Sequence, residues 1–464
     1  MSKILLRAGK SPFQVLSARA SVDDYPSAVF ATNVGNMVYS DAMHRILSTP
    51  DAEVVANTYL GERGGVNRAY TDRINSEFDH FVVPLANAFR PSFLRVLDRL
   101  TETIEALRIP VTVVGVGVEG GPGSLSRAPE DVDQDIKSAT RRFMNAVLDR
   151  SSRVGVRGES TRSYLRSLGY GDEHVQIIGC PSLFRNGAAL HVDKLAHPLQ
   201  RDDLISINIS PDVKPMAEFA MRQAAQYPRL VYIPQDLETF QLLLTGRDPK
   251  EFDPVMPTHR GHPFFKEGRV ITFVDSRTWI DFLKSVRFAF GTRIHGNIAA
   301  LLAGTPAVVM VHDTRTRELV DYHEIPNRLS ADAAKLDAAG LYEEADFTAF
   351  NEGHQGRFET FSSFLRENGI STVFDQGKAN PAYDRAIAAL PLPRQVRLLD
   401  EPASTGPLYR LRRRWRQTNY RFSAPVPHAP ASLGEAAGAA IDRIITRRTG
   451  AERAASAKVA TGRL

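Results

Sequence analysis

The sequence predicts an α/β protein in which two doubly wound, Rossmann-like domains face each other across a cleft. Short apolar segments alternate with longer segments of helical apolar spacing, which favours parallel sheets covered by helices on both faces. A single irregular segment, 186–203, interrupts the alternation and divides it into two units. Charged turns follow two successive apolar strands, 288–290 and 307–311, and open α/β sheets bind ligands at the carboxyl ends of their strands.

The chain divides into four parts on this pattern. Residues 1–25 look like an irregular lead-in, and 26–195 form the N-terminal Rossmann-like domain. Residues 200–378 form the C-terminal Rossmann-like domain and end in a closing helix at 350–368. Residues 379–464 lose the apolar periodicity and are expected to be a linker and a basic tail.

In the first unit, β-branched and aromatic runs predict the strands, and apolar residues three or four apart predict the helices. The expected strands are 28–32, 53–59, 81–85, 111–118, 154–157 and 175–178. The expected helices are 37–47, 93–107, 135–150 and 160–168. Residues 61–76 hold three glycines and three arginines and are expected to be a loop.

The second unit repeats the same alternation. Its expected strands are 204–210, 230–234, 270–274, 288–290 and 307–311. Its expected helices are 216–226, 236–246, 276–286 and 298–303, before the closing helix.

The composition predicts a soluble globular protein. Of the 464 residues, 43% are apolar and 24% charged, which is ordinary for that class, and no apolar run reaches 18 residues. The N-terminus holds only the short apolar patch Ile4–Leu6 and does not resemble a secretory signal. The single cysteine, Cys180, excludes a disulfide framework, and we expect it to be a small buried residue in a cytoplasmic protein.

The positive net charge belongs to the tail. Residues 401–464 contain 12 Lys/Arg and 4 Asp/Glu, a net charge of +8. The other 400 residues have a net charge of −3, which gives the overall net charge of +5. This balance does not support nucleic-acid binding by the body of the protein. The stretch 408–421 interleaves arginines with aromatic residues, which fits either peripheral contact with an anionic membrane or a solvated, disordered tail.

The turn between the apolar strand 288–290 and the short helix that follows is a candidate anion site. Backbone N–H groups at a helix start are unpaired and lie at the positive end of the helix dipole. Arg293 adds a planar guanidinium that matches a carboxylate or phosphate, and His295 can hold or release a proton near neutral pH. A second charged turn, 312–317, should open beside the first.

These turns resemble the polysaccharide pyruvyl transferases. The resemblance lies in Arg293-Ile294-His295, in Gly304-Thr305-Pro306, in the strand 307–311 and in His312-Asp313-Thr314-Arg315. It covers residues 28–375 in order, is specific at 293–315 and diffuse elsewhere, and implies a glycosyltransferase-B-like arrangement of the two domains. It also implies transfer of an enolpyruvyl group from phosphoenolpyruvate to a sugar of a cell-surface glycan or its lipid-linked precursor, giving a pyruvate ketal.

The resemblance implies a donor site with phosphoenolpyruvate as co-substrate, no other cofactor and no metal. The expected donor-binding residues are Arg293, Ile294, His295, Asn297, Asp313, Arg315 and Arg317. His295 is expected to be the general acid or to stabilise the departing phosphate, with Arg293 beside it as the second catalytic residue. Asp313 is expected to orient His295 or to accept a proton from a sugar hydroxyl.

The acceptor is expected on the N-terminal side, near Asn33, Gly35, Asn36 and Gly117. Asn36 stands where the family has aspartate, so either an acceptor carboxylate is absent or the residue only caps the next helix. Cys180 also departs from the family pattern. The glycines at 115–120 match the dinucleotide fingerprint formally, but no helix follows directly, so a glycine-rich loop lining the cleft is the better interpretation.

Two other functions stay open at this point. A nucleotide-sugar-dependent glycosyltransferase would use the same basic turns for a diphosphate, with Glu318 toward a ribose. A non-catalytic scaffold bound to a membrane assembly through its tail would need neither donor.

Overall fold

The computed structural model describes residues 1–21, 29–31, 33–62, 68–119 and 132–398. The basic stretch 408–421 lies outside the described residues. Within the described ranges, no helix is both long enough and apolar enough to span a membrane.

The N-terminal lobe is built on a parallel four-stranded sheet of order β2-β1-β3-β5. Its strands are β1 Ser2–Arg7, β2 Ala52–Asn57, β3 His80–Pro84 and β5 Val111–Val114. The pair β7 Val154–Val156 and β8 Val175–Ile177 continues beside β5, and the short strands β4 Asn87–Phe89 and β6 Gly117–Val118 pair with each other. The helices of this part are α1 Asn36–Leu47, η2 Tyr59–Glu62, α2 Arg68–Glu77, η3 Pro91–Phe93, α3 Leu94–Ala106, α4 Gln134–Leu148, α5 Glu159–Ser167 and η5 Pro181–Phe184.

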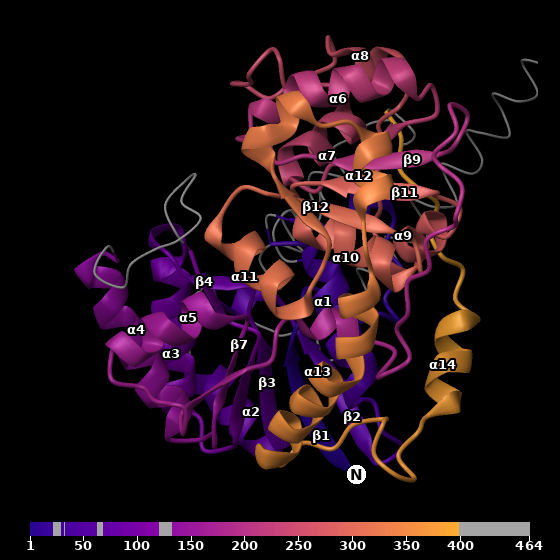
Figure 1. The fold of residues 1–464 in the computed structure, drawn as a ribbon. Helices are drawn as coiled ribbons and strands as arrows, with labels where there is room; N and C mark the ends of the chain where they lie inside the picture. The colour runs from indigo at the N-terminus through magenta and orange to yellow at the C-terminus, as the bar shows by residue number, and fades with distance from the viewer. Residues whose placement is uncertain (22–28, 32, 63–67, 120–131, 399–464) are drawn as a thin grey trace, which may run out of the picture.

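The C-terminal lobe is built on a parallel five-stranded sheet of order β10-β9-β11-β12-β13. Its strands are β9 Ile205–Asn208, β10 Val231–Tyr232, β11 Phe288–Gly291, β12 Ala307–Val311 and β13 Asn327–Leu329. The helices that follow in the chain are α6 Pro215–Gln226, α7 Leu237–Thr245, α8 Pro263–Lys266, α9 Ser276–Leu283, α10 Ile294–Leu302, α11 Thr314–His323, η6 Ser330–Lys335, α12 Ala338–Glu344, α13 Thr348–Glu367 and α14 Pro381–Ala388. Figure 1 shows this lobe above the first.

Both sheets share one strand order, in which the first strand lies between the second and the third. Ligands bind such sheets at the point where the winding reverses, beyond the carboxyl ends of the first and third strands. In the N-terminal sheet these strands are β1 and β3, and in the C-terminal sheet they are β9 and β11. Since the two lobes face each other, the two reversal points open toward one space. The predicted architecture of two doubly wound α/β units facing a cleft is therefore confirmed.

The first strand corrects the prediction of an irregular lead-in. Residues 2–7 form β1, which pairs in parallel with β2 on one side and β3 on the other. Leu5 packs on one face of the sheet, whereas Ile4 and Leu6 pack on the opposite face. A three-residue apolar run is enough here because both faces are covered, so the strand needs no polar alternation.

Two neighbouring predictions are also wrong. The described residues of the expected strand 28–32 form bends and a turn, and β1 takes the place that this strand was expected to hold. Most of the expected loop 61–76 is helical, because α2 begins at Arg68 and packs Ile74 into the core.

The last two described helices return to the N-terminal lobe. Phe350 at the start of α13 packs in the core of the second lobe, as expected of a closing helix, but Phe361, Phe364 and Leu365 pack with Ile4 and Leu6 of β1, so the helix bridges both lobes. In Figure 1, α13 lies beside α1 and β1. Tyr383 of α14 then contacts α1 through a hydrogen bond of 3.1 Å to His44. The predicted range 200–378 therefore does not form one packing unit.

Candidate active site

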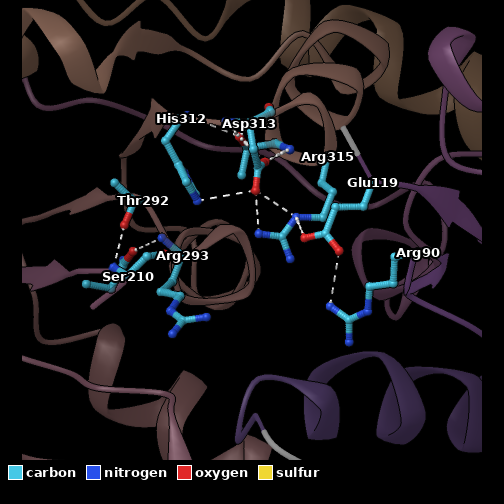
Figure 2. A network of polar contacts seen from close by, with 10 residues as sticks. Arg90, Glu119, Ser210, Thr292, Arg293, His312, Asp313 and Arg315 are labelled. Carbon is cyan, nitrogen blue, oxygen red and sulfur yellow. Dashed lines mark hydrogen bonds and ion pairs between the residues drawn. The ribbon is translucent and has the colours of Figure 1, made fainter. Parts of the chain in front are cut away.

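A cavity of about 530 Å³ lies between the lobes, at the carboxyl ends of both sheets. The N-terminal lobe contributes residues that follow β1 and β3, and the C-terminal lobe contributes the turns after β11 and β12. Figure 2 shows Arg90, Arg293 and Arg315 directing their guanidinium groups toward this open space from different elements.

The turn after β11 is held in place by Asn208 at the end of β9. Gly291 has φ +142°, and a Cβ there would meet the Asn208 carbonyl oxygen at 1.9 Å, so only glycine fits. The backbone N–H of Thr292 donates to that carbonyl, and the N–H of Arg293 donates to Asn208 Oδ1 at 2.7 Å. Asn297 braces the turn from behind through bonds from its Nδ2 to the carbonyls of Gly291 and Arg293.

This turn presents the start of α10 to the cavity. The helix has no side-chain cap, and no described residue accepts a hydrogen bond from the backbone N–H groups of Ile294 and His295. These donors lie where the helix dipole is positive. The arrangement is suited to an anion.

His295 lines the cavity and is surrounded by cations. Its ring lies 5.7 Å from that of Tyr39, and its Nε2 has no hydrogen-bond partner among the described residues. Burial, and to a smaller extent the positive charges of Arg157, Arg315 and Arg293, lower the pKa of His295 to about 3. His295 is therefore neutral in the empty cavity at neutral pH, so a cationic general acid requires a bound anion.

Five guanidinium groups line the cavity, and they differ in their partners. Arg7 is paired with Glu62, and Arg315 donates to Asp313 at 2.7 Å. Arg90 and Arg315 both lie within reach of Glu119, at 3.5 and 3.9 Å.

No carboxylate of the described chain lies within 4.0 Å of the remaining two guanidinium groups, those of Arg157 and Arg293. Arg157 only donates from Nε to the Gly115 carbonyl, at 2.9 Å.

The structure brings six of the predicted site residues to the cavity wall. They are Asn33, Asn36, Arg293, Ile294, His295 and Arg315.

The other predicted site residues lie behind the wall or outside it. Gly35 is the N-cap of α1, and Gly117 lies beneath Arg157, whose Cδ would be 2.9 Å from a Cβ at that position. Asp313 caps α11 and pairs with Arg315, so it does not orient His295 as predicted. Arg317 pairs with Asp321 on the surface of α11 and does not reach the cavity.

Asn36 does not cap α1, contrary to one of the two expectations for it. It is the first residue of the helix, and its Nδ2 donates to the carbonyl of Phe30 at 2.9 Å. Asn33 takes the bonding role instead, because its Oδ1 accepts from the N–H of Gly35 at 2.7 Å. Cys180 is buried as predicted.

Sequence reasoning missed several residues of the cavity wall. Arg7, Asn87, Arg90 and Gln235 have no local motif, because each simply ends, begins or follows a short strand. His312 could have been found, since it follows β12 as closely as the Arg293 turn follows β11. Its Nε2 lies 3.3 Å from Asp313 Oδ2, although it is not aligned for a hydrogen bond.

Glu318 does not face the cavity, so the predicted ribose contact of a nucleotide-sugar enzyme is not formed. Both carboxylate oxygens accept hydrogen bonds from Thr161, and the side chain is buried under Arg157. Burial raises the pKa of Glu318 to about 7, against the opposing effects of Thr161 and Arg157. In the described ranges, no three His, Cys, Asp or Glu residues are grouped as metal ligands would be.

The fold and the site define a two-lobed α/β protein whose central cleft is lined by arginines around a helix start. A sequence model of the polysaccharide pyruvyl transferase family matches residues 33–314, which is more than half of the chain. The chain therefore belongs to the polysaccharide pyruvyl transferase family. Among curated proteins, none matches.

Comparison with solved structures finds similarity at low sequence identity. MnaA of S. aureus with UDP is 13% identical, covering 85% of this chain and 100% of that one, with a TM-score of 0.41. UDP-GlcNAc 2-epimerase of Neisseria meningitidis bound to UDP-GlcNAc is 11% identical, covering 79% and 100%, with a TM-score of 0.41. HepE of Anabaena with UDP and glucose is 14% identical, covering 80% and 98%, with a TM-score of 0.38. Similarities of this size say nothing about what this chain binds.

Proposed function

We propose that this protein transfers a pyruvyl group from phosphoenolpyruvate to two hydroxyls of a glycan sugar, forming a pyruvate ketal. One observation carries the proposal: three arginines from two lobes, Arg157, Arg293 and Arg315, act on one buried histidine, His295, at an uncapped helix start. Membership of the pyruvyl transferase family supports the same chemistry.

The donor binds as an anion in the proposed complex. Arg293 and the N–H groups of Ile294 and His295 hold one anionic group, because they form a single turn. Arg157 holds the other, since it reaches the cavity from the opposite lobe without an opposing carboxylate. Guanidinium groups suit both the carboxylate and the phosphate of phosphoenolpyruvate.

His295 moves the proton in this proposal. The negative charge of the bound donor lies beside His295 and offsets the two unpaired guanidinium groups, those of Arg157 and Arg293, so it favours the protonated ring against burial and raises the pKa of His295. His295 protonates C3 of the donor, the first sugar hydroxyl adds to C2, and the C2–O bond to phosphate breaks. The second hydroxyl then adds to C2. Of the two hydroxyl protons, one returns to His295 and the other leaves with the phosphate.

The partners follow from this chemistry. Phosphoenolpyruvate is the co-substrate, and a polysaccharide or its lipid-linked precursor is the acceptor. We also propose that the protein is cytoplasmic and that residues 408–421 contact an anionic membrane surface peripherally.

Replacement of His295 tests the proposed function. Purified protein is incubated with phosphoenolpyruvate and a set of neutral p-nitrophenyl glycosides, with phosphate release and the ketal methyl signal as readouts. Loss of a positioned acid typically lowers turnover 10²–10⁴-fold, so we expect His295→Ala to lose at least about 100-fold. His191→Ala is the matched control, because His191 is exposed and pairs only with Asp193 on the surface.

The same assay separates Arg293 from Arg317. Arg293→Ala is expected to raise the KM for phosphoenolpyruvate, whereas Arg317→Ala is expected to leave it unchanged, because Arg317 pairs on the surface. Unchanged turnover in His295→Ala would remove this residue from the chemistry. Wild-type protein that neither binds nor consumes phosphoenolpyruvate would refute the proposed function.

A further inference from the structure

Two buried carboxamide side chains line the cavity without a hydrogen-bond partner in the described chain, those of Asn87 and Gln235. Their exposed fractions are 8% and 1%. They come from opposite lobes, since Asn87 begins β4 and Gln235 lies between β10 and α7. Buried polar groups are nearly always paired, so four unpaired atoms on one cavity wall indicate a site that a ligand completes.

Gln235 is held close to the proposed reaction centre. Its carboxamide lies between two helix starts, because a Cβ on Gly35 would be 2.7 Å from Oε1 and a Cβ on Gly296 would be 2.6 Å from Nε2. The backbone carbonyl of Gln235 accepts a hydrogen bond from the N–H of Val34 at 2.8 Å. The same position at Gly35 would be 2.8 Å from the Cβ of His295. The carboxamide of Gln235 and the ring of His295 therefore belong to one corner of the cavity.

The chemistry of a carboxamide distinguishes two kinds of ligand. It presents a donor and an acceptor side by side, and a hydroxyl can satisfy either one. A carboxylate or phosphate only accepts, so it would leave both carboxamide oxygens unpaired. Two carboxamides with all polar atoms unpaired therefore match a polyhydroxylated ring better than an anion.

The charges of the cavity lead to the same conclusion. Five guanidinium groups line it, and Glu62, Asp313 and Glu119 neutralise three of them, so two positive charges remain. Phosphoenolpyruvate carries one carboxylate and a phosphate with about −1.5 to −2 charge at neutral pH, so the donor alone uses both. A charged acceptor would find no free cation among the described wall residues.

We propose that the acceptor enters this cavity as an uncharged sugar ring, with Asn87 and Gln235 binding its hydroxyls. Gln235 Oε1 accepts from a hydroxyl that attacks the donor and orients it beside His295. This inference rests on the proposed function and adds the class of the acceptor at the reacting ring.

Three matched glycosides test the charge preference. Binding of p-nitrophenyl glucoside, p-nitrophenyl glucuronide and the glucuronide methyl ester to wild-type protein is measured by calorimetry, with and without phosphoenolpyruvate. We expect the glucoside and the ester to bind alike in the presence of the donor, and the glucuronide to bind at least about tenfold more weakly. Equal or tighter binding of the glucuronide overturns the proposal, and so does a lack of glycoside binding in protein that binds the donor.

Two near-isosteric variants test the carboxamides. Asn87→Leu and Gln235→Met are each expected to weaken glucoside binding about tenfold and to leave phosphoenolpyruvate affinity within about twofold. Gln355→Met is the matched control, because Gln355 is exposed on α13 and bonds only to Glu359. Glucoside binding unchanged in both variants overturns the assignment. If wild-type protein fails to bind phosphoenolpyruvate, the proposed function fails, while loss of donor-free glucoside binding in Asn87→Leu and Gln235→Met still supports the assignment of the two carboxamides and unchanged binding still overturns it.

Discussion

Glu318 lies behind the cavity wall, and its protonation state changes the charge next to Arg157. Its pKa is raised to about 7, so it is largely neutral at pH 5 and charged at pH 8. When it is charged, it opposes Arg157, which is one of the two cations of the wall without a carboxylate partner. The affinity of the cavity for anions should therefore fall as the pH rises through 7.

Sulfate measures this effect, because its own charge does not change between pH 5 and pH 9. We expect sulfate affinity of the wild type to fall about fivefold from pH 6 to pH 8, which corresponds to about 1 kcal/mol for a buried charge near Arg157. Glu318→Gln should bind sulfate with nearly constant affinity over the same range. Glu359→Gln on the exposed face of α13 is the control. A pH dependence that survives in Glu318→Gln would assign the titration to another group.

At the scale of elements, α13 packs against the first strand, β1. Phe364 is fully buried against the face of the first sheet that includes Ile4 and Leu6, and its ring lies against Gly155 of β7. Large-to-small changes in a core remove the transfer free energy and leave a cavity, so Phe364→Ala should lower the free energy of unfolding by about 3–5 kcal/mol. Phe252→Ala, at an exposed position, should change it by less than about 0.5 kcal/mol. Urea denaturation followed by circular dichroism measures both, and similar losses would contradict the packing of α13.

Local elements could be predicted from the sequence, whereas long-range placement could not. The turn at 291–295 was recognisable because strand, glycine, arginine and helix follow one another within a few residues. The path of α13 back to β1 has no local signal, because an amphipathic helix fits any apolar face. β1 was missed because its apolar run of three residues becomes a strand only when β2 and β3 lie on either side.

The same limit applies to the site. Arg293, Ile294 and His295 are contiguous, so one motif placed all three at the cavity. Arg157, Gln235 and Asn87 reach that cavity from segments far apart in the chain, and each is an ordinary strand-end residue in sequence. They become neighbours only because the two lobes face each other, which no local pattern shows. The N-terminal wall was therefore predicted only in part, through Asn33 and Asn36.

At the scale of the whole molecule, buried histidines control the response to acid. Among the described residues, burial is the main cause that lowers the pKa of His44, His80 and His262 to about 4 and that of His295 to about 3. The folded-state pKa values lie below the unfolded value near 6.5, so the unfolded chain binds more protons between the two. The contribution of these histidines to the free energy of unfolding is therefore fully present above pH 6.5 and is lost as the pH falls toward 4. Glu318, between pH 4.5 and 7, and Asp41 act in the opposite direction, because burial raises the pKa of each carboxyl group, but they are fewer than these four histidines.

His80→Gln isolates one of these contributions. A glutamine can keep a hydrogen bond to Thr112, which His80 makes at 2.8 Å, but it does not titrate. Each histidine that stays neutral in the folded state contributes a slope of up to about 1.4 kcal/mol per pH unit below pH 6.5. We therefore expect the free energy of unfolding of His80→Gln to fall less steeply than that of the wild type between pH 6.5 and 4.5, by about that amount per unit. His191→Gln, at an exposed histidine, should follow the wild type. Parallel curves for His80→Gln and the wild type would show that His80 is protonated in the folded protein.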